Sequence, residues 1–201
     1  MIHASFCGID FGPVLRMIHI TMKQSLLLTA LLFSTLTLHA EDHKLTAENT
    51  TIKFVGTKKD GKHEGSFKKL DGTLSVDAAD VSKSKLSLTI DIESITTDTD
   101  KLTAHLKSPD FFDAKANPTA KFVSTAIKAG AAKDTYSITG DLTLLGKTNP
   151  VTFDAKAVTA DGTKTLAGQV AIKRSQWGMT YGPDKVNDEV QLTLEVKVKS
   201  K

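Results

Sequence analysis

The sequence is poor in the residue types that build redox and metal centres. Cysteine occurs once in 201 residues, at Cys7, so the chain cannot form an internal disulfide or a cluster of cysteine ligands. The histidines after residue 40 are His43, His63 and His105, and they lack the close spacing that is typical of metal ligands. We therefore expect no metal site and no cofactor.

Motifs for enzymatic chemistry are missing as well. The chain has no nucleophile elbow and no dinucleotide-binding fingerprint. The glycine-rich segment Gly56–Gly65 lacks the spacing of a phosphate-binding loop, and no long helix follows it, so we predict a hairpin there. Asp110 and Asp113 are close in sequence, but spacing on a loop assigns no general acid and base. The sequence predicts a protein that is not an enzyme.

Only one long apolar run is present, at 25–38. Met22-Lys23-Gln24 precedes it and Leu38-His39-Ala40 follows it, which is the order of a secretory signal peptide cleaved after Ala40. The run is shorter than the roughly 20 residues that span a bilayer, and no cysteine follows it to carry a lipid anchor. We predict an upstream extension at 1–21 that precedes the true start at Met22, a signal peptide at 22–40, and one exported domain at 41–201.

Charge and size describe that domain further. The whole chain has a formal net charge of +3, and loss of Arg16, Lys23 and Asp10 with the first 40 residues leaves +2. Such a balance predicts no nucleic-acid partner. The remaining length suits one domain with a real core.

Period-two alternation of apolar and polar residues dominates the exported part. One run has Leu86, Leu88, Ile90 and Ile92 on a single face, and another covers 190–198. Further strands are expected at 51–57, 65–76 with a break near Lys68 and Lys69, 119–127, 135–145, 151–158 and 165–174. About eight antiparallel strands can close into a barrel around one ligand, with a two-sheet sandwich as the alternative. Helical spacing predicts a short helix over 98–108 and a briefer helical turn near 78–83.

Three segments carry a resemblance to a known family. They are Leu106–Asp113 (LKSPDFFD), Gly140–Val151 (GDLTLLGKTNPV) and Lys173–Gly178 (KRSQWG). From about Leu45 to Val198 the chain resembles the YceI-like proteins, which are secreted bacterial carriers. The resemblance implies an all-β fold, an eight-stranded antiparallel lipocalin-like barrel whose interior holds a polyisoprenoid or a similar long apolar molecule. In a bacterium, the predicted signal peptide would direct such a carrier to the periplasm.

The resemblance also bears on individual positions. His63, Gly65 and Phe67 match a histidine and glycine that often precede an aromatic residue in this family, which favours a structural role for them. One departure is at Glu48–Thr51, where many relatives have an Asp-Xaa-Xaa-His-Ser-like start to the first strand. A ligand contact of that histidine in relatives cannot be transferred to this chain.

The apolar strand faces are expected to line the ligand space. The predicted lining residues are Leu74, Leu88, Ile90, Phe122, Leu142, Phe153, Val170 and Leu192. A register error of one residue would turn several of them outward.

An aromatic pair sits where a polar loop is expected. In an extended backbone Phe111 and Phe112 point to opposite sides, so one is expected to plug the core while the other lines the ligand entrance. The alternative is that both rings anchor the core. His105, in the predicted helix, either binds a ligand head group or hydrogen-bonds the loop.

Arg174 and Trp177 are the remaining candidates for ligand contact. Arg174 shares the inward parity of its strand, where its charge either pairs with Asp110 or Asp113 as a structural clamp or meets a ligand head group. Trp177 is expected to cap one end of the barrel with its ring, and the loop 178–188 to form a rim.

Together these features predict an exported carrier of an isoprenoid quinone, a polyprenyl phosphate, or a fatty acid or amide. Its partner would be that long-chain apolar small molecule, with transient contact with a membrane or membrane protein for lipid exchange. The oligomeric state, a homodimer included, stays open. One alternative is a stress-related envelope protein with a filled barrel and no ligand, and a weaker one is an enzyme acting on an isoprenoid.

Overall fold

The structure is a computed structural model that describes residues 40–199. The predicted extension at 1–21, the signal peptide except for Ala40, and Cys7 lie outside the described residues. Within the described part, no helix combines the length and hydropathy needed to cross a bilayer.

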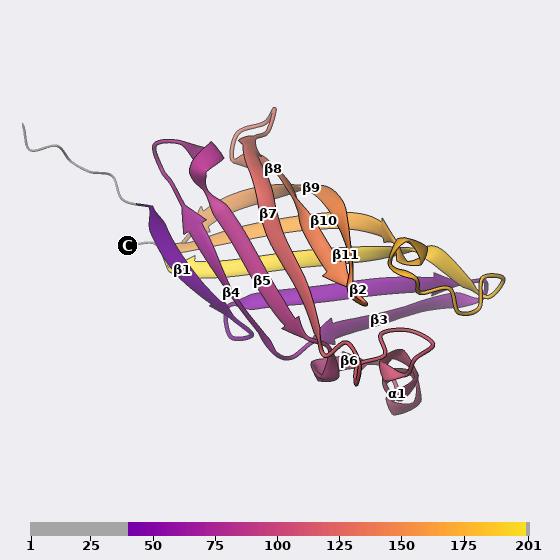
Figure 1. Ribbon diagram of the computed structural model, residues 1–201. Helices are drawn as coiled ribbons and strands as arrows, with labels where there is room; N and C mark the ends of the chain where they lie inside the picture. Colours follow the sequence, from indigo (N-terminus) through magenta and orange to yellow (C-terminus); the bar gives the residue numbers. More distant parts are fainter. Residues whose placement is uncertain (1–39, 200–201) are drawn as a thin grey trace, which may run out of the picture. The chain divides into compact units, whose positions relative to one another are not determined.

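Eleven β-strands form a single antiparallel sheet in the order β1-β4-β5-β7-β8-β9-β10-β11-β2-β3-β6 (Figure 1). The strands are β1 (Glu41–Thr46), β2 (Thr50–Lys58), β3 (Gly61–Phe67), β4 (Leu70–Val76), β5 (Lys85–Asp91), β6 (Ile95–Thr97), β7 (Thr119–Ala129), β8 (Thr135–Leu144), β9 (Lys147–Ala160), β10 (Thr163–Lys173) and β11 (Val186–Lys199). Three short 3₁₀ helices, η2 (Val81–Lys83), η3 (Ile92–Ser94) and η4 (Arg174–Trp177), and one α-helix, α1 (Asp100–Lys107), connect them. The sheet curls into a half-barrel.

The predicted number of eight strands is therefore wrong, for two physical reasons. The break expected near Lys68 and Lys69 is confirmed, because β3 and β4 are separate strands, but a second, unexpected bend at η3 divides β6 from β5. The bends face each other, because the backbone N–H of Lys68 donates to the carbonyl of Ser94 over 3.1 Å. In addition, β1 was not predicted, since Leu45 is its only large aliphatic residue. The expected hairpin at Gly56–Gly65 is confirmed by the pairing of β2 with β3.

Apolar alternation places one face of each strand inside the curl. Along β5, Leu86, Leu88 and Ile90 are 0 %, 3 % and 7 % exposed. Lys85 and Ser87, which alternate with them along the strand, are exposed. Burial of each such side chain contributes roughly 1.5–3 kcal/mol to folding. The inward residues of the strands form one large core cluster.

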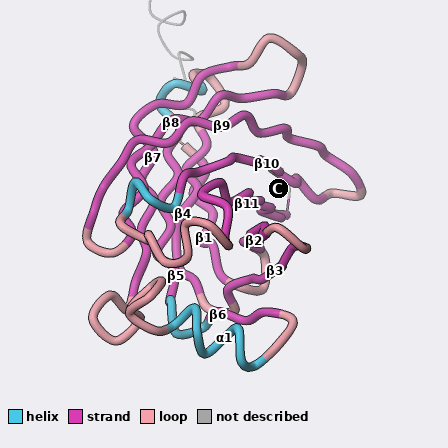
Figure 2. Tube along the Cα trace, turned by 90° about the vertical axis from the view of Figure 1, so that its right-hand side faces the viewer, coloured by secondary structure: helices cyan, strands magenta, loops and turns pink. Residues whose placement is uncertain are grey.

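Helix α1 lies beside β6 at one end of the sheet (Figure 2). The side-chain oxygen of Thr99 caps the helix by accepting a hydrogen bond from the N–H of Leu102 over 3.3 Å. The helix ends at Ser108, just before Pro109. Its Leu106 packs with Phe54, Ile95 and Phe111 in a second apolar cluster. The predicted short helix is thus confirmed, with slightly narrower bounds.

Candidate functional site: cavities inside the half-barrel

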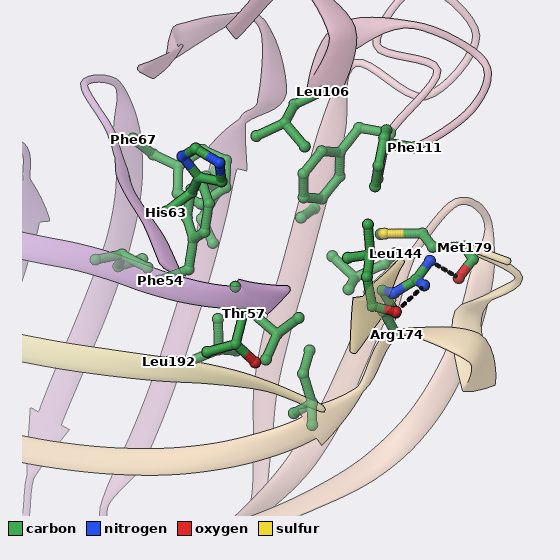
Figure 3. Close-up of a pocket in the computed structure, with 18 of the residues that line it drawn as sticks. Phe54, Thr57, His63, Phe67, Leu106, Phe111, Leu144, Arg174, Met179 and Leu192 are labelled. Atoms are coloured by element: carbon green, nitrogen blue, oxygen red, sulfur yellow. Dashed lines mark hydrogen bonds between the residues drawn. The ribbon is translucent and has the colours of Figure 1, made fainter. Parts of the chain in front are cut away.

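A cavity of about 170 Å³ lies at the α1 end of the curled sheet. Leu106 and Phe111 approach it from one side, and Phe54 and Leu192 approach it from β2 and β11 (Figure 3). All of the wall surface open to this cavity is apolar. We call this space the α1-end cavity.

A second, smaller cavity of about 80 Å³ adjoins the α1-end cavity. Ile52, Ile90, Leu142 and Leu192 line both spaces, so the two cavities are neighbours that share part of their walls. The rings of Phe122 and Phe153 pack with their centroids 5.8 Å apart on the wall of the second cavity. We call it the middle cavity.

Most of the predicted lining residues lie on these walls. Those that do are Leu88, Ile90, Phe122, Leu142, Phe153, Val170 and Leu192, while Leu74 lines a third cavity at the other end of the strands. Their role in ligand binding itself stays a prediction.

The aromatic pair behaves differently from expectation, because its backbone is not extended. The N–H of Phe112 donates to the carbonyl of Leu106 over 3.0 Å, and Asp113, with φ of 41°, donates from its N–H to the carbonyl of Ser108 over 2.9 Å. These turns aim both Phe111 and Phe112 at the same α1-end cavity. The extended backbone assumed for the pair is therefore wrong, while the division into a plug and an entrance residue stays a prediction.

Two rings, those of His105 and Tyr181, pack against Phe111 and against each other. The rings of His105 and Phe111 are 5.0 Å apart between centroids, those of His105 and Tyr181 4.9 Å, and those of Phe111 and Tyr181 5.2 Å. The ring nitrogen Nε2 of His105 hydrogen-bonds Oδ2 of Asp110 over 2.9 Å. We call His105, Phe111 and Tyr181 the aromatic latch, since it joins α1 to the loop after η4. His105 bonds the loop and does not line the cavity.

Arg174 does not pair with Asp110 or Asp113, so the predicted clamp is wrong. Its side chain is 5 % exposed, and its guanidinium donates to three backbone carbonyls: Met179 over 2.7 Å, Val186 over 2.9 Å and Asn187 over 3.1 Å. The reason is local, because the chain leaves β10 at Lys173 and turns into η4, which aims the guanidinium at the following loop (Figure 3). The part of Arg174 that meets the α1-end cavity is its aliphatic stem, since the open wall there is apolar.

The charge of Arg174 is balanced by a nearby carboxylate that it does not touch directly. Asp188 accepts hydrogen bonds from the hydroxyl of Ser175 over 2.7 Å and from its backbone N–H over 2.8 Å. These bonds, and less strongly the positive charge of Arg174, hold the pKa of the Asp188 carboxyl below its ordinary value.

Trp177 lies in the core and lines none of the three cavities. Its side chain is 1 % exposed. Its ring packs within the core and not on the surface that faces a cavity. A ligand could therefore contact Trp177 only if the core opened.

Sequence reasoning missed several wall residues. Ile52 and Phe54 share a face of β2, and their period-two spacing was a usable signal. Met179 had no such signal, because it sits in a loop whose position is set by the carbonyl bond to Arg174. Met179 and Val186, from the segment 178–188, lie on the cavity wall, and the rim role expected for this segment stays a prediction.

Metal ligands are not gathered at this site. Within residues 40–199, no three histidine, cysteine or acidic side chains are placed to hold an ion. His63, on the cavity wall, has its ring nitrogen Nδ1 3.1 Å from a carboxylate oxygen of Asp98.

Comparison with known proteins identifies the family. The YceI-like domain model matches residues 43–198. The chain belongs to the YceI-like family. Protein YceI of Escherichia coli O6:H1 is 36 % identical over 192 residues, which cover 88 % of this chain and 97 % of that protein.

Solved structures share the fold. The crystal structure of BcnA of Burkholderia cenocepacia has a TM-score of 0.69 and 31 % identity, covering 75 % of this chain and 96 % of that one. A polyisoprenoid binding domain from Saccharophagus degradans has a TM-score of 0.61 and 16 % identity, covering 81 % of this chain and all of that one. At this identity the second likeness shows the fold alone.

Proposed function

We propose that this protein is an exported carrier that holds the tail of a polyisoprenoid, or of a similar long apolar lipid, in the α1-end and middle cavities. The observation that carries the proposal is the apolar wall that the two cavities share, since Ile52, Ile90, Leu142 and Leu192 line both spaces. The curled sheet would enclose the lipid as a lipocalin-like barrel does. The family and the fold shared with a polyisoprenoid binding domain support this reading.

Burial of the tail would supply the affinity. At about 0.8 kcal/mol for each buried CH₂, two five-carbon isoprene units gain roughly 8 kcal/mol before association costs. The same wall disfavours a polar head group, because burying one without a hydrogen-bond partner is costly. The head is therefore proposed to stay at the mouth, near the aromatic latch, and the tail to lie inside.

The proposal includes its cellular setting. The predicted signal peptide at 22–40 supports export to the periplasm, where an apolar lipid needs a protein to cross the aqueous space. Transient contact with a membrane would then load and unload the carrier.

Native mass spectrometry of the protein purified from the periplasm, followed by organic extraction, tests the function. We expect a stoichiometric lipid with an isoprenoid tail, and rebinding of an added isoprenoid quinone after its removal. Ile90→Trp places an indole in both cavities and is expected to abolish rebinding. Lys85→Trp, on the same strand but exposed, is the matched control and should bind normally. An empty protein that also refuses quinones and polyprenyl lipids would favour the envelope structural role instead.

A further inference from the structure

A third cavity, of about 470 Å³, lies at the end of the strands opposite α1. Its wall comes from the start of β1, the end of β4, the β7–β8 and β9–β10 turn regions and the end of β11. Unlike the α1-end cavity, it combines apolar surface with polar surface. We call it the β1-end cavity.

The β1-end cavity is a separate compartment. It shares no wall residue with the other two cavities. Along the chain leading through β5, Ser84 lines the β1-end cavity and Leu88 lines the middle cavity, and Leu86 between them is 0 % exposed. On this strand, a fully buried side chain therefore stands between the two compartments.

The polar groups of this cavity include one ammonium, one carboxylate and four hydroxyls that can donate or accept, those of Tyr136, Ser84, Thr159 and Thr165. The hydroxyl of Tyr136 and the ammonium of Lys164 have no hydrogen bond or ion pair with other side chains or backbone groups of the described residues. His43, on β1, adds a ring whose Nε2 lies 3.7 Å from the Glu41 carboxylate. Asp134 is the one carboxylate among the wall residues, and it sits exposed in the turn before β8.

Lys164 is placed to reach a bound ligand. It lines the cavity together with Thr165 and Leu166, its neighbours on β10, and it pairs in register with Thr159 of β9, which also lines the cavity. A lysine at such a strand end lays its aliphatic stem along apolar surface and holds its charge at the mouth. The arrangement matches a ligand with an apolar chain and one anionic end.

We propose that the β1-end cavity is a second binding site, which takes a medium-chain aliphatic carboxylate. The chain packs against Leu74, Ile138 and Val196, and the carboxylate accepts hydrogen bonds from Lys164 and Tyr136. Asp134 opposes this charge, so its removal strengthens binding. The site does not depend on a lipid in the other two cavities.

Calorimetric titration of the delipidated protein with dodecanoate, with dodecylamine as the charge-reversed probe, tests the proposal. We expect dodecanoate to bind more tightly than the amine. Lys164→Met should weaken dodecanoate binding about fivefold, as expected for a partly exposed charge pair. Asp134→Asn should tighten it about twofold. Lys156→Met, an exposed lysine on β9 that lines no cavity, is the matched control and should change nothing.

Variants of the walls separate this site from the carrier site. Ala157→Leu adds side-chain atoms to the β1-end cavity and should abolish dodecanoate binding, whereas Ile90→Trp should leave it intact. Equal affinity for the two probes, or an unchanged affinity in Lys164→Met, would overturn the proposal. Loss of dodecanoate binding in Ile90→Trp would overturn it too, because the carboxylate would then sit in the carrier site. The surface variants at Lys164 and Asp134 keep the test decisive if Ala157→Leu fails to fold.

Discussion

The indole Nε1 of Trp177 donates a hydrogen bond to the backbone carbonyl of Leu142 over 2.9 Å, across 35 positions of the chain. The side chain of Leu142 lines both the α1-end cavity and the middle cavity. Trp177 therefore ties η4 to β8 and holds this wall in place without touching the cavity space. Arg174, three residues earlier, ties the same turn to β11 and the loop before it.

Arg174 is predicted to act on stability and not on head-group choice. Arg174→Met leaves three carbonyls without their donor, and we expect a loss of about 3 kcal/mol of unfolding free energy in urea titrations. In Arg174→Lys, which keeps the charge and some donors, the ratio of affinities for a polyprenyl phosphate and the uncharged polyprenol should stay constant. A selective loss of phosphate affinity would show that the guanidinium meets the head group after all.

The aromatic latch is predicted to control ligand exchange. Tyr181→Ala removes two ring contacts, each worth about 0.5–1.5 kcal/mol, while Tyr181 is 42 % exposed and contributes little to the core. We expect faster release of a bound quinone in stopped-flow fluorescence, about fivefold, with a nearly unchanged melting temperature. Val158→Ala, at a residue 50 % exposed on β9, is the control. Equal release rates in the two variants would show that exchange uses another route.

Gly140 is predicted to be intolerant of a side chain. A Cβ there would lie 2.5 Å from the ring of Phe122 and 2.6 Å from the carbonyl oxygen of Val123. Gly140→Ala should cost about 1–3 kcal/mol of unfolding free energy, because the ring or the strand must move. Gly56→Ala, where no atom lies within 4 Å, is the matched control and should keep normal stability in the same denaturation experiment.

The stability of the protein is predicted to depend on pH through Asp188. Because hydrogen bonds from Ser175 lower the pKa of its carboxyl, the charged form stabilises the fold at neutral pH. That contribution is lost as the pH falls below the ordinary aspartate pKa of about 3.9 and through the lowered value in the fold. Asp188→Asn should therefore be less stable than the native protein at pH 7, by about 1 kcal/mol given the exposure of the site. The difference should shrink near pH 2, and a difference independent of pH would contradict the assignment.

Local patterns predicted the strands well and their number poorly. The alternation that placed Leu88 and Ile90 inside needed only the period of a β-strand. The bend at Lys68–Lys69 had a signal in the sequence, but that at η3 interrupts a run whose apolar pattern continues to Ile92. β1 was missed by the prediction because an edge strand, which pairs on one side only, can form with few apolar residues.

The wall residues of the cavities also fall into two groups, those that local patterns predict and those that they do not. Phe122 and Phe153 could be assigned to the interior from parity alone. Phe111 and Phe112 could not, because the turns that aim them depend on backbone bonds to Leu106 and Ser108 rather than on strand geometry. The hydrogen-bond partners of Arg174 could not be predicted either. They are three backbone carbonyls, and every residue type carries a backbone carbonyl, so the residue types around Arg174 do not reveal them.

By itself, the amino-acid sequence determined the β character of the protein, the inward faces of most strands and the resemblance to its family, since each depends on residue order along short segments. The tertiary structure alone decided that the β1-end cavity shares no wall residue with the other two cavities, and that the latch joins His105 to Tyr181. These features arise where strands distant in the chain meet. Their geometry depends on curl, bends and register summed over the whole sheet, which no local pattern encodes.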